Sequence, residues 1–228
     1  FEQGSHHLFN RNEVEKEKEV IIDEINSYRD SPAEEIFDEF ENNLYRGHEM
    51  GRNILGTVDL VESYTRHDII RFIKNNYSTD KIIISTIGDI PFNKFKNKIL
   101  PHFGDYQPRA TILHRKIFDK LPIFNKIEKR DNHLSHCIIG GLAYHYDNPK
   151  KMQMILLNNI LGGPGMNSRL NLNIREKYGF AYTIESQYNA YSDTGNFSIY
   201  MGVDPQSLEK AVNLVFKELY KLKDNKLG

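Results

Sequence analysis

The chain has 228 residues, of which 39% are apolar, 27% charged and 11% aromatic. This length and composition predict one large domain or two of about 100 residues each, and they exclude a disordered chain. The 30 Lys and Arg residues are balanced by 31 Asp and Glu residues, so the basic surplus typical of nucleic-acid-binding proteins is absent. No apolar run approaches the roughly 18 residues of a membrane helix. The single cysteine, Cys137, excludes an internal disulfide framework and a Cys-based zinc cluster. From the composition and the lack of a long apolar run, we expect a soluble globular protein.

The first half of the chain is predicted to be mainly helical. Asp30-Ser31-Pro32 separates two segments with apolar residues at helical spacing, and Lys81–Gly88 (KIIISTIG) has the β-branched composition of a buried strand. The predicted order is a helix at 13–29, a helix at 33–45, a loop at 51–56, a helix capped by Thr65–Asp68, a strand at 81–88 and a helix at 92–100.

The second half is predicted to alternate strands and helices. Pro101, Gly104 and Pro108 mark a change of composition, which places a domain boundary near residues 104–118 and predicts domains at 1–108 and 109–228. The predicted order after this boundary is strand-like alternation at 125–130 and 133–146, a helix at 152–161, a Gly-rich turn at 162–165, a helix at 168–177 ended by Gly179, strands at 180–188 and 196–203, and a final helix at 205–222.

Glu17 and Glu24 lie seven residues apart, which places both on one face of the first predicted helix. They flank an apolar stripe formed by Val14, Ile21, Ile25 and Tyr28. A carboxylate beside a buried stripe needs an ion pair, a hydrogen bond or a metal. The alternative is that these long side chains reach solvent from the edge of the stripe.

Histidine pairs are weaker candidates for a metal site. His133 and His136 are three residues apart, so on a strand they would point to opposite faces. His6 and His7 are adjacent but follow Gly4-Ser5 near the start of the chain. The Gly162–Gly165 turn superficially suggests phosphate binding, but it lacks a Walker or dinucleotide motif, so a tight connection with positive φ is the alternative. Cys137 lies in an apolar segment, as a buried small hydrophobic residue would.

Arg175 and Tyr182 lie on either side of Gly179, at the end of a predicted helix and the start of a predicted strand. A helix that ends at a glycine and turns into a strand can direct both side chains into one cleft. A guanidinium and a phenol together can polarise a carbonyl group or hold a peptide backbone. The alternative is an Arg at a helix C-terminus and a half-buried Tyr.

Three stretches of the chain resemble the pitrilysin/insulinase family of zinc peptidases, the inverted zincins. Residues 14–31 (VEKEKEVIIDEINSYRDS) are similar to its Glu-rich helix, residues 48–57 (HEMGRNILGT) to its Gly-Arg-x-Ile-Leu-Gly loop, and residues 160–195 to its second-domain signature. The resemblance implies an α+β fold of two consecutive, incomplete homologous domains. Each would be a mostly antiparallel sheet packed with helices, as in LuxS-like metalloenzymes.

The resemblance also implies roles for the four candidate residues. Glu24 corresponds to the third zinc ligand, Glu17 to the carboxylate that supports the ligands, and Arg175 and Tyr182 to the pair that holds the substrate. The family's His-x-x-Glu-His motif, which supplies two ligands and the general base, does not occur in these residues. We therefore expect the segment alone to be inactive and to lack stoichiometric zinc.

The resemblance implies part of a zinc-dependent endopeptidase that hydrolyses peptides in a chamber formed by two halves, as a homodimer or heterodimer. A non-catalytic partner or scaffold subunit of an active homologue is the first alternative, and a peptide-binding module without hydrolysis is the second. We expect no nucleic-acid partner and no membrane span. A cytoplasmic location is expected, with the periplasm as the alternative.

Overall fold

The computed structural model describes residues 9–104, 118 and 123–224, and it divides into two compact units. Unit 1 comprises residues 1–25 and 55–115, and unit 2 comprises residues 26–54 and 116–228. Helices and a three-stranded antiparallel sheet make up the described part, which confirms the α+β class. The division into domains at 1–108 and 109–228 remains a prediction.

Most helices of unit 1 lie where the sequence predicts them. Helix α2 (Arg11–Arg29) starts in this unit, and α4 (Val58–Ser63), α5 (Arg66–Asn76) and α6 (Phe92–Phe103) lie within it. The predicted cap of α5 is a capping box, in which Thr65 and Asp68 each bond the backbone N–H of the other. The short helix α4 was not predicted, and a single 3₁₀ turn at Thr79–Lys81 precedes the segment expected to be a strand.

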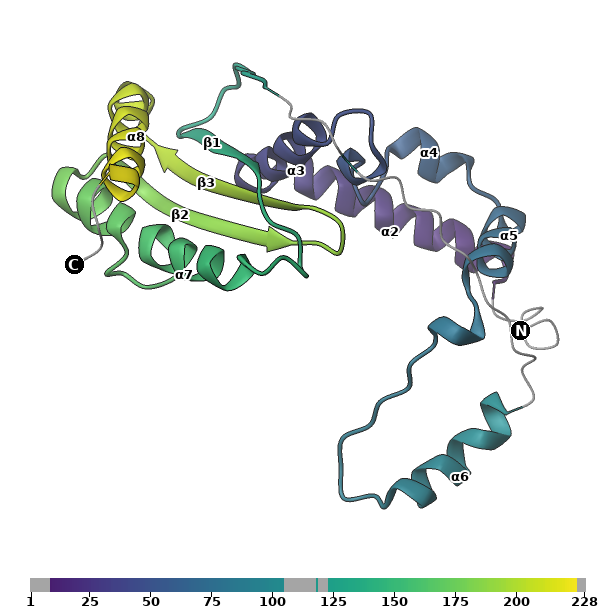
Figure 1. The fold of residues 1–228 in the computed structure, drawn as a ribbon. Coiled ribbons are helices and arrows are strands. Elements are labelled where there is room, and N and C mark those ends of the chain that lie inside the picture. The colour runs from purple at the N-terminus through teal and green to yellow at the C-terminus, as the bar shows by residue number, and fades with distance from the viewer. Residues whose placement is uncertain (1–8, 105–117, 119–122, 225–228) are drawn as a thin grey trace. The chain divides into compact units, whose positions relative to one another are not determined.

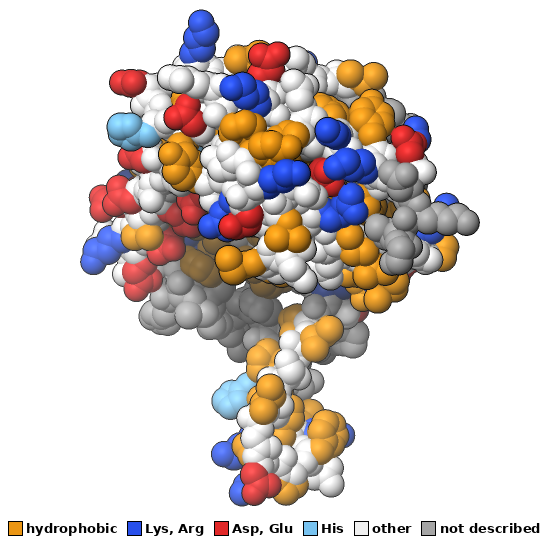
Figure 2. Space-filling view, turned by 90° about the vertical axis from the view of Figure 1, so that its left-hand side faces the viewer, with side chains coloured by type: hydrophobic (Ala, Val, Ile, Leu, Met, Phe, Trp, Pro, Cys, Tyr) orange, Lys and Arg blue, Asp and Glu red, His pale blue; other side chains and the backbone are white. Residues whose placement is uncertain are grey.

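The prediction of a buried strand at Lys81–Gly88 is wrong. Residues 82–87 have no strand partner in the described part of the chain, and they run as an extended connection toward α6 (Figure 1). Ile83 is 91% and Ile87 103% exposed, and apolar side chains cover much of the lower extension in Figure 2. The β-branched residues favour an extended backbone, but a strand also needs a neighbour, which local sequence cannot supply.

We expect the double substitution Ile83→Lys, Ile87→Lys to lower the binding of a hydrophobic dye to the 228-residue chain. Both side chains are fully exposed, so their replacement removes apolar surface while changing the free energy of unfolding by no more than about 0.5 kcal/mol each. Dye fluorescence and thermal unfolding measure the two effects. Asn93→Lys with Asn97→Lys adds the same charge in α6 and serves as the control. Equal dye binding by the two double variants would contradict the prediction.

The sheet of unit 2 consists of three antiparallel strands in the order β1-β3-β2. The strands are β1 (Ser135–Leu142), β2 (Ala181–Ala190) and β3 (Gly195–Val203). In this register Ile138 of β1 faces Tyr200 of β3, and Ile184 of β2 faces Met201. The predicted turn between the last two strands is confirmed, because Tyr191 N–H donates to the Thr194 carbonyl at 2.9 Å.

Helices cover both faces of this sheet (Figure 1). On one face Ile199 and Met201 of β3 pack with α7 (Lys151–Gly162), the helical stretch before β2, and α8 (Leu208–Asp224). Cys137 packs against this cluster, as predicted, and its burial raises the pKa of the thiol. On the other face α3 (Pro32–Leu44) contributes Phe40 and Leu44 to a second cluster. The alternation of side chains along each strand supplies both layers.

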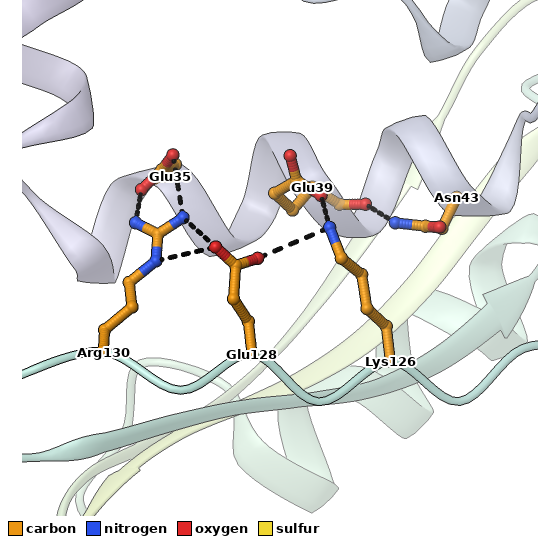
Figure 3. Close-up of polar contacts among 6 residues, drawn as sticks. All are labelled: Glu35, Glu39, Asn43, Lys126, Glu128 and Arg130. Carbon is orange, nitrogen blue, oxygen red and sulfur yellow. Dashed lines mark hydrogen bonds and ion pairs between the residues drawn. The ribbon is translucent and has the colours of Figure 1, made fainter.

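Ion pairs hold the extended segment 123–130 along α3 (Figure 3). Lys126 and Arg130 pair with Glu39 and Glu35 of the helix, and Glu128 lies 2.9 Å from Arg130 and 3.5 Å from Lys126. The strand expected at 125–130 is not found, because the segment lies along a helix and is assigned to no strand. These pairs are largely exposed, so each contributes at most about 1 kcal/mol.

A glycine at the end of α7 is required by packing. The expectation of positive φ in the Gly162–Gly165 turn is wrong, since among the described residues only Gly47, Gly56, Gly88 and Gly179 have it. A Cβ on Gly162 would lie 2.7 Å from the backbone nitrogen of Ser186 in β2. Glycine thus lets the end of α7 approach β2 closely.

Candidate functional site

Glu17 and Glu24 lie on the exposed face of α2. The apolar stripe beside them is confirmed at Val14 and Ile25, which are buried. Seven residues correspond to a rise of about 10.5 Å along the helix, so the two carboxylates lie two turns apart. Neither has a hydrogen bond or ion pair with another described residue. In this structure both side chains reach solvent, and their oxygens are available to a ligand.

The described residues do not form a complete zinc site. No group of three or more His, Cys, Asp or Glu side chains among them could hold a metal ion, whereas catalytic zinc requires three protein ligands. Glu24 can supply one carboxylate oxygen, and the remaining ligands would have to come from elsewhere.

His133 and His136 do not form a metal site with each other in the described part of the chain. His136 lies on β1, where its Nδ1 is 2.9 Å from the Tyr200 hydroxyl, and burial lowers its pKa. His133 precedes the strand and is exposed. His6 and His7 lie outside the described residues.

Arg175 lies on a π-helix, where the sequence predicted a regular helix. The π-helix, labelled η3 (Asn171–Glu176), forms the middle of the helical stretch that precedes β2. Leu170 and Ile174 on this stretch are fully buried in the first core cluster, whereas Arg175 is exposed. A π-helix is rare and is frequently found at functional sites. The guanidinium of Arg175 therefore lies on the surface of a helical stretch that is anchored in the core.

Gly179 ends the helical stretch, as predicted. Its φ is +65°, and its N–H donates to the Arg175 carbonyl at 2.9 Å. Strand β2 then begins with an irregularity, since Ala181 faces Val203 and Thr183 faces Gly202. Tyr182 is the extra residue of this β-bulge, and it is 64% exposed. Bulges often redirect a side chain beside an active site, so both candidate residues lie on irregular backbone around one turn.

Aromatic and basic side chains surround this turn. Tyr178 and Phe180 stack with their ring centroids 5.5 Å apart, and Lys177 and Lys210 lie over these rings at 5.4 and 5.8 Å. Basic and apolar side chains are interspersed on the face of unit 2 seen in Figure 2. The surface next to Arg175 can therefore contact both apolar and polar parts of a peptide.

Glu218 is a buried residue that the sequence analysis missed. Its carboxylate is 3% exposed and accepts hydrogen bonds from Arg169, Asn173 and Lys221. One signal could have identified it: position 218 continues the buried stripe of α8, three residues after Val215 and seven after Ala211. A glutamate at a core position of an amphipathic helix calls for buried partners.

The fold assigns the chain to a structural class of peptidase domains. A solved structure of a peptidase M16 inactive domain from Pseudomonas fluorescens superposes on it with a TM-score of 0.82. That match is 20% identical in sequence and covers 96% of this chain and 53% of the other. Residues 63–228 match the family described as "Peptidase M16 inactive domain", more than half of the chain. The chain belongs to this family, which confirms its resemblance to the pitrilysin/insulinase peptidases.

The curated relatives are longer proteins. The "Uncharacterized zinc protease YmxG" of Bacillus subtilis is 31% identical over 96% of this chain and 53% of its own length. The "Probable mitochondrial-processing peptidase subunit beta" of Schizosaccharomyces pombe is 30% identical over 82% of this chain and 44% of its own length. The chain thus spans about half the length of these relatives. No helix of its described residues is long and apolar enough to cross a membrane.

Proposed function

We propose that this chain is the substrate-holding part of a zinc-dependent endopeptidase. The observation that carries the proposal is the pair Arg175 and Tyr182, exposed on a π-helix and a β-bulge around Gly179 in a chain of this peptidase family. The two relatives named above are a zinc protease and a processing-peptidase subunit, which supports peptide hydrolysis by the full-length protein.

The two side chains suit different parts of a bound peptide. The Arg175 guanidinium can donate two parallel hydrogen bonds to backbone carbonyls, and the Tyr182 hydroxyl can donate to the carbonyl oxygen on which negative charge develops. Zinc, when bound, would activate the attacking water. In this proposal Glu24 provides one carboxylate ligand and Glu17 supports the ligand set. The 228-residue segment alone would neither retain stoichiometric zinc nor hydrolyse peptides.

The proposal includes a second peptidase-like half. Arg175 and Tyr182 would reach a peptide enclosed between two halves, in a homodimer or a heterodimer. The naming of one relative as a subunit supports such an assembly. A cytoplasmic location remains our expectation, with the periplasm as the alternative.

A second candidate function is a non-catalytic partner of an active homologue. The family's description as an inactive domain favours it, as does the lack of a three-ligand metal group among the described residues. A full-length protein that contains no zinc, yet forms a stable complex with an active homologue, would support this candidate over the first.

We expect Tyr182→Phe in the full-length protein to lower kcat for a peptide substrate about 100-fold, as the loss of one oxyanion donor does. Zinc content should stay unchanged, because the substitution removes only the hydroxyl. Steady-state kinetics and metal analysis measure the two quantities. Tyr220→Phe is the matched control, since Tyr220 is similarly exposed at 60% but lies on α8. An unchanged kcat in the Tyr182 variant would remove this residue from the site.

A further inference from the structure

The buried carboxylate of Glu218 joins α8 to the helical stretch that carries Arg175. Its Oε2 accepts from Arg169 Nη2 at 3.0 Å and from Asn173 Nδ2 at 3.2 Å, and its Oε1 accepts from Lys221. Burial acts to raise its pKa, but the bonds from Lys221 and Arg169 outweigh it and hold the pKa below the usual value. The carboxylate is therefore charged at neutral pH, and both of its oxygens accept hydrogen bonds.

Two kinds of contact hold the helical stretch in place. Leu170 and Ile174 anchor it in the apolar core, a contact that is not directional and tolerates small rotations. Arg169 and Asn173, the residues immediately before these two, bond a single oxygen of Glu218. Hydrogen bonds to a charged group are stronger than neutral ones and require a favourable angle, so this second contact restricts the rotation of the stretch about its axis.

Arg175 follows Asn173 by two residues within the same π-helix. A rotation of this segment would move the guanidinium, whereas Tyr182 lies on β2, which is held separately by its pairing with β3. The helical stretch lies next to α8 in Figure 1, and the two elements are in contact. The position of Arg175 thus depends on Glu218, although the structure shows no direct bond between them.

We propose that Glu218 is a positioning residue, which sets the orientation of the π-helix and thereby aims Arg175 at the substrate. This proposal rests on the proposed function, because it concerns the substrate-holding role of Arg175. Glu218 itself contacts no substrate and acts through Arg169 and Asn173.

The first test is amide hydrogen exchange of the full-length protein with Glu218→Gln. The neutral amide weakens the bonds from Arg169 and Asn173, so exchange should become faster at residues 169–178 and stay unchanged in β3. Glu209→Gln, an exposed position on the same helix, should change neither region. Unchanged exchange at 169–178 in the Glu218 variant would overturn the proposal without any reference to hydrolysis.

The second test is a double-mutant cycle on peptide hydrolysis. We expect R175Q to lower kcat/KM about 100-fold and E218Q to lower it about 10-fold, as a small displacement of a binding group does. If Glu218 acts through Arg175, E218Q should add little in the R175Q background. Additive losses would mean a general structural role and would overturn the proposal.

Two further outcomes are separated by the same experiment. If R175Q leaves kcat/KM unchanged, the proposed function of Arg175 fails, and the positioning role fails with it. If E218Q does not fold, Asn173→Ala replaces it in the cycle, since it removes one donor and leaves the Arg169–Glu218 pair intact. A non-additive loss of kcat/KM in that variant supports the proposal, and an additive loss or no loss overturns it.

Discussion

Glu24→Gln should remove zinc from the full-length protein and abolish peptide hydrolysis with it. An amide is a much weaker zinc ligand than a carboxylate, and the loss of a mere supporting residue already costs about 10- to 100-fold in metal affinity. We therefore expect a loss of more than about 100-fold for the ligand that we propose. Metal analysis after dialysis and titration with a competing chelator measure the affinity. The side chain is exposed and has no hydrogen bond or ion pair with another described residue, so the fold should be unaffected.

Two other glutamates of α2 provide the controls for this experiment. Glu19→Gln makes the same chemical change on an exposed part of the helix and should leave zinc and turnover unchanged. Glu17→Gln should lower zinc affinity about 10-fold, as expected for a supporting carboxylate. If zinc content and turnover of the Glu24 variant equal those of the Glu19 variant, the assignment of Glu24 as a ligand is wrong.

Features set by local sequence were predicted well. The helix α5 begins at the Thr65–Asp68 capping box, and Gly179 ends the stretch before β2 because it alone there adopts a positive φ. Such signals need only a few neighbouring residues. The position of Arg175 and Tyr182 on either side of this turn could therefore be predicted from the sequence.

Features that depend on distant partners were not predicted. Residues 81–88 have strand composition, but they find no partner strand in the described part of the chain. The bulge at Tyr182 depends on the register of β2 with β3. Two of the three hydrogen-bond donors of Glu218, Arg169 and Asn173, lie more than forty residues earlier in the chain. Local patterns thus identified candidate side chains, whereas the backbone that aims them comes from long-range packing.

This packing makes Ile174 the position in the π-helix where truncation should cost most. Ile174 is fully buried in the first core cluster, and Ile174→Ala should lower the free energy of unfolding by about 2–5 kcal/mol through lost burial and a residual cavity. Urea denaturation of the 228-residue chain measures this loss. Leu172→Ala in the same π-helix is the matched control, because Leu172 is 48% exposed and should lose about 0.5 kcal/mol or less. Similar losses at both positions would show that the π-helix is not anchored through Ile174, and the support that we infer for Arg175 would then rest on Glu218 alone.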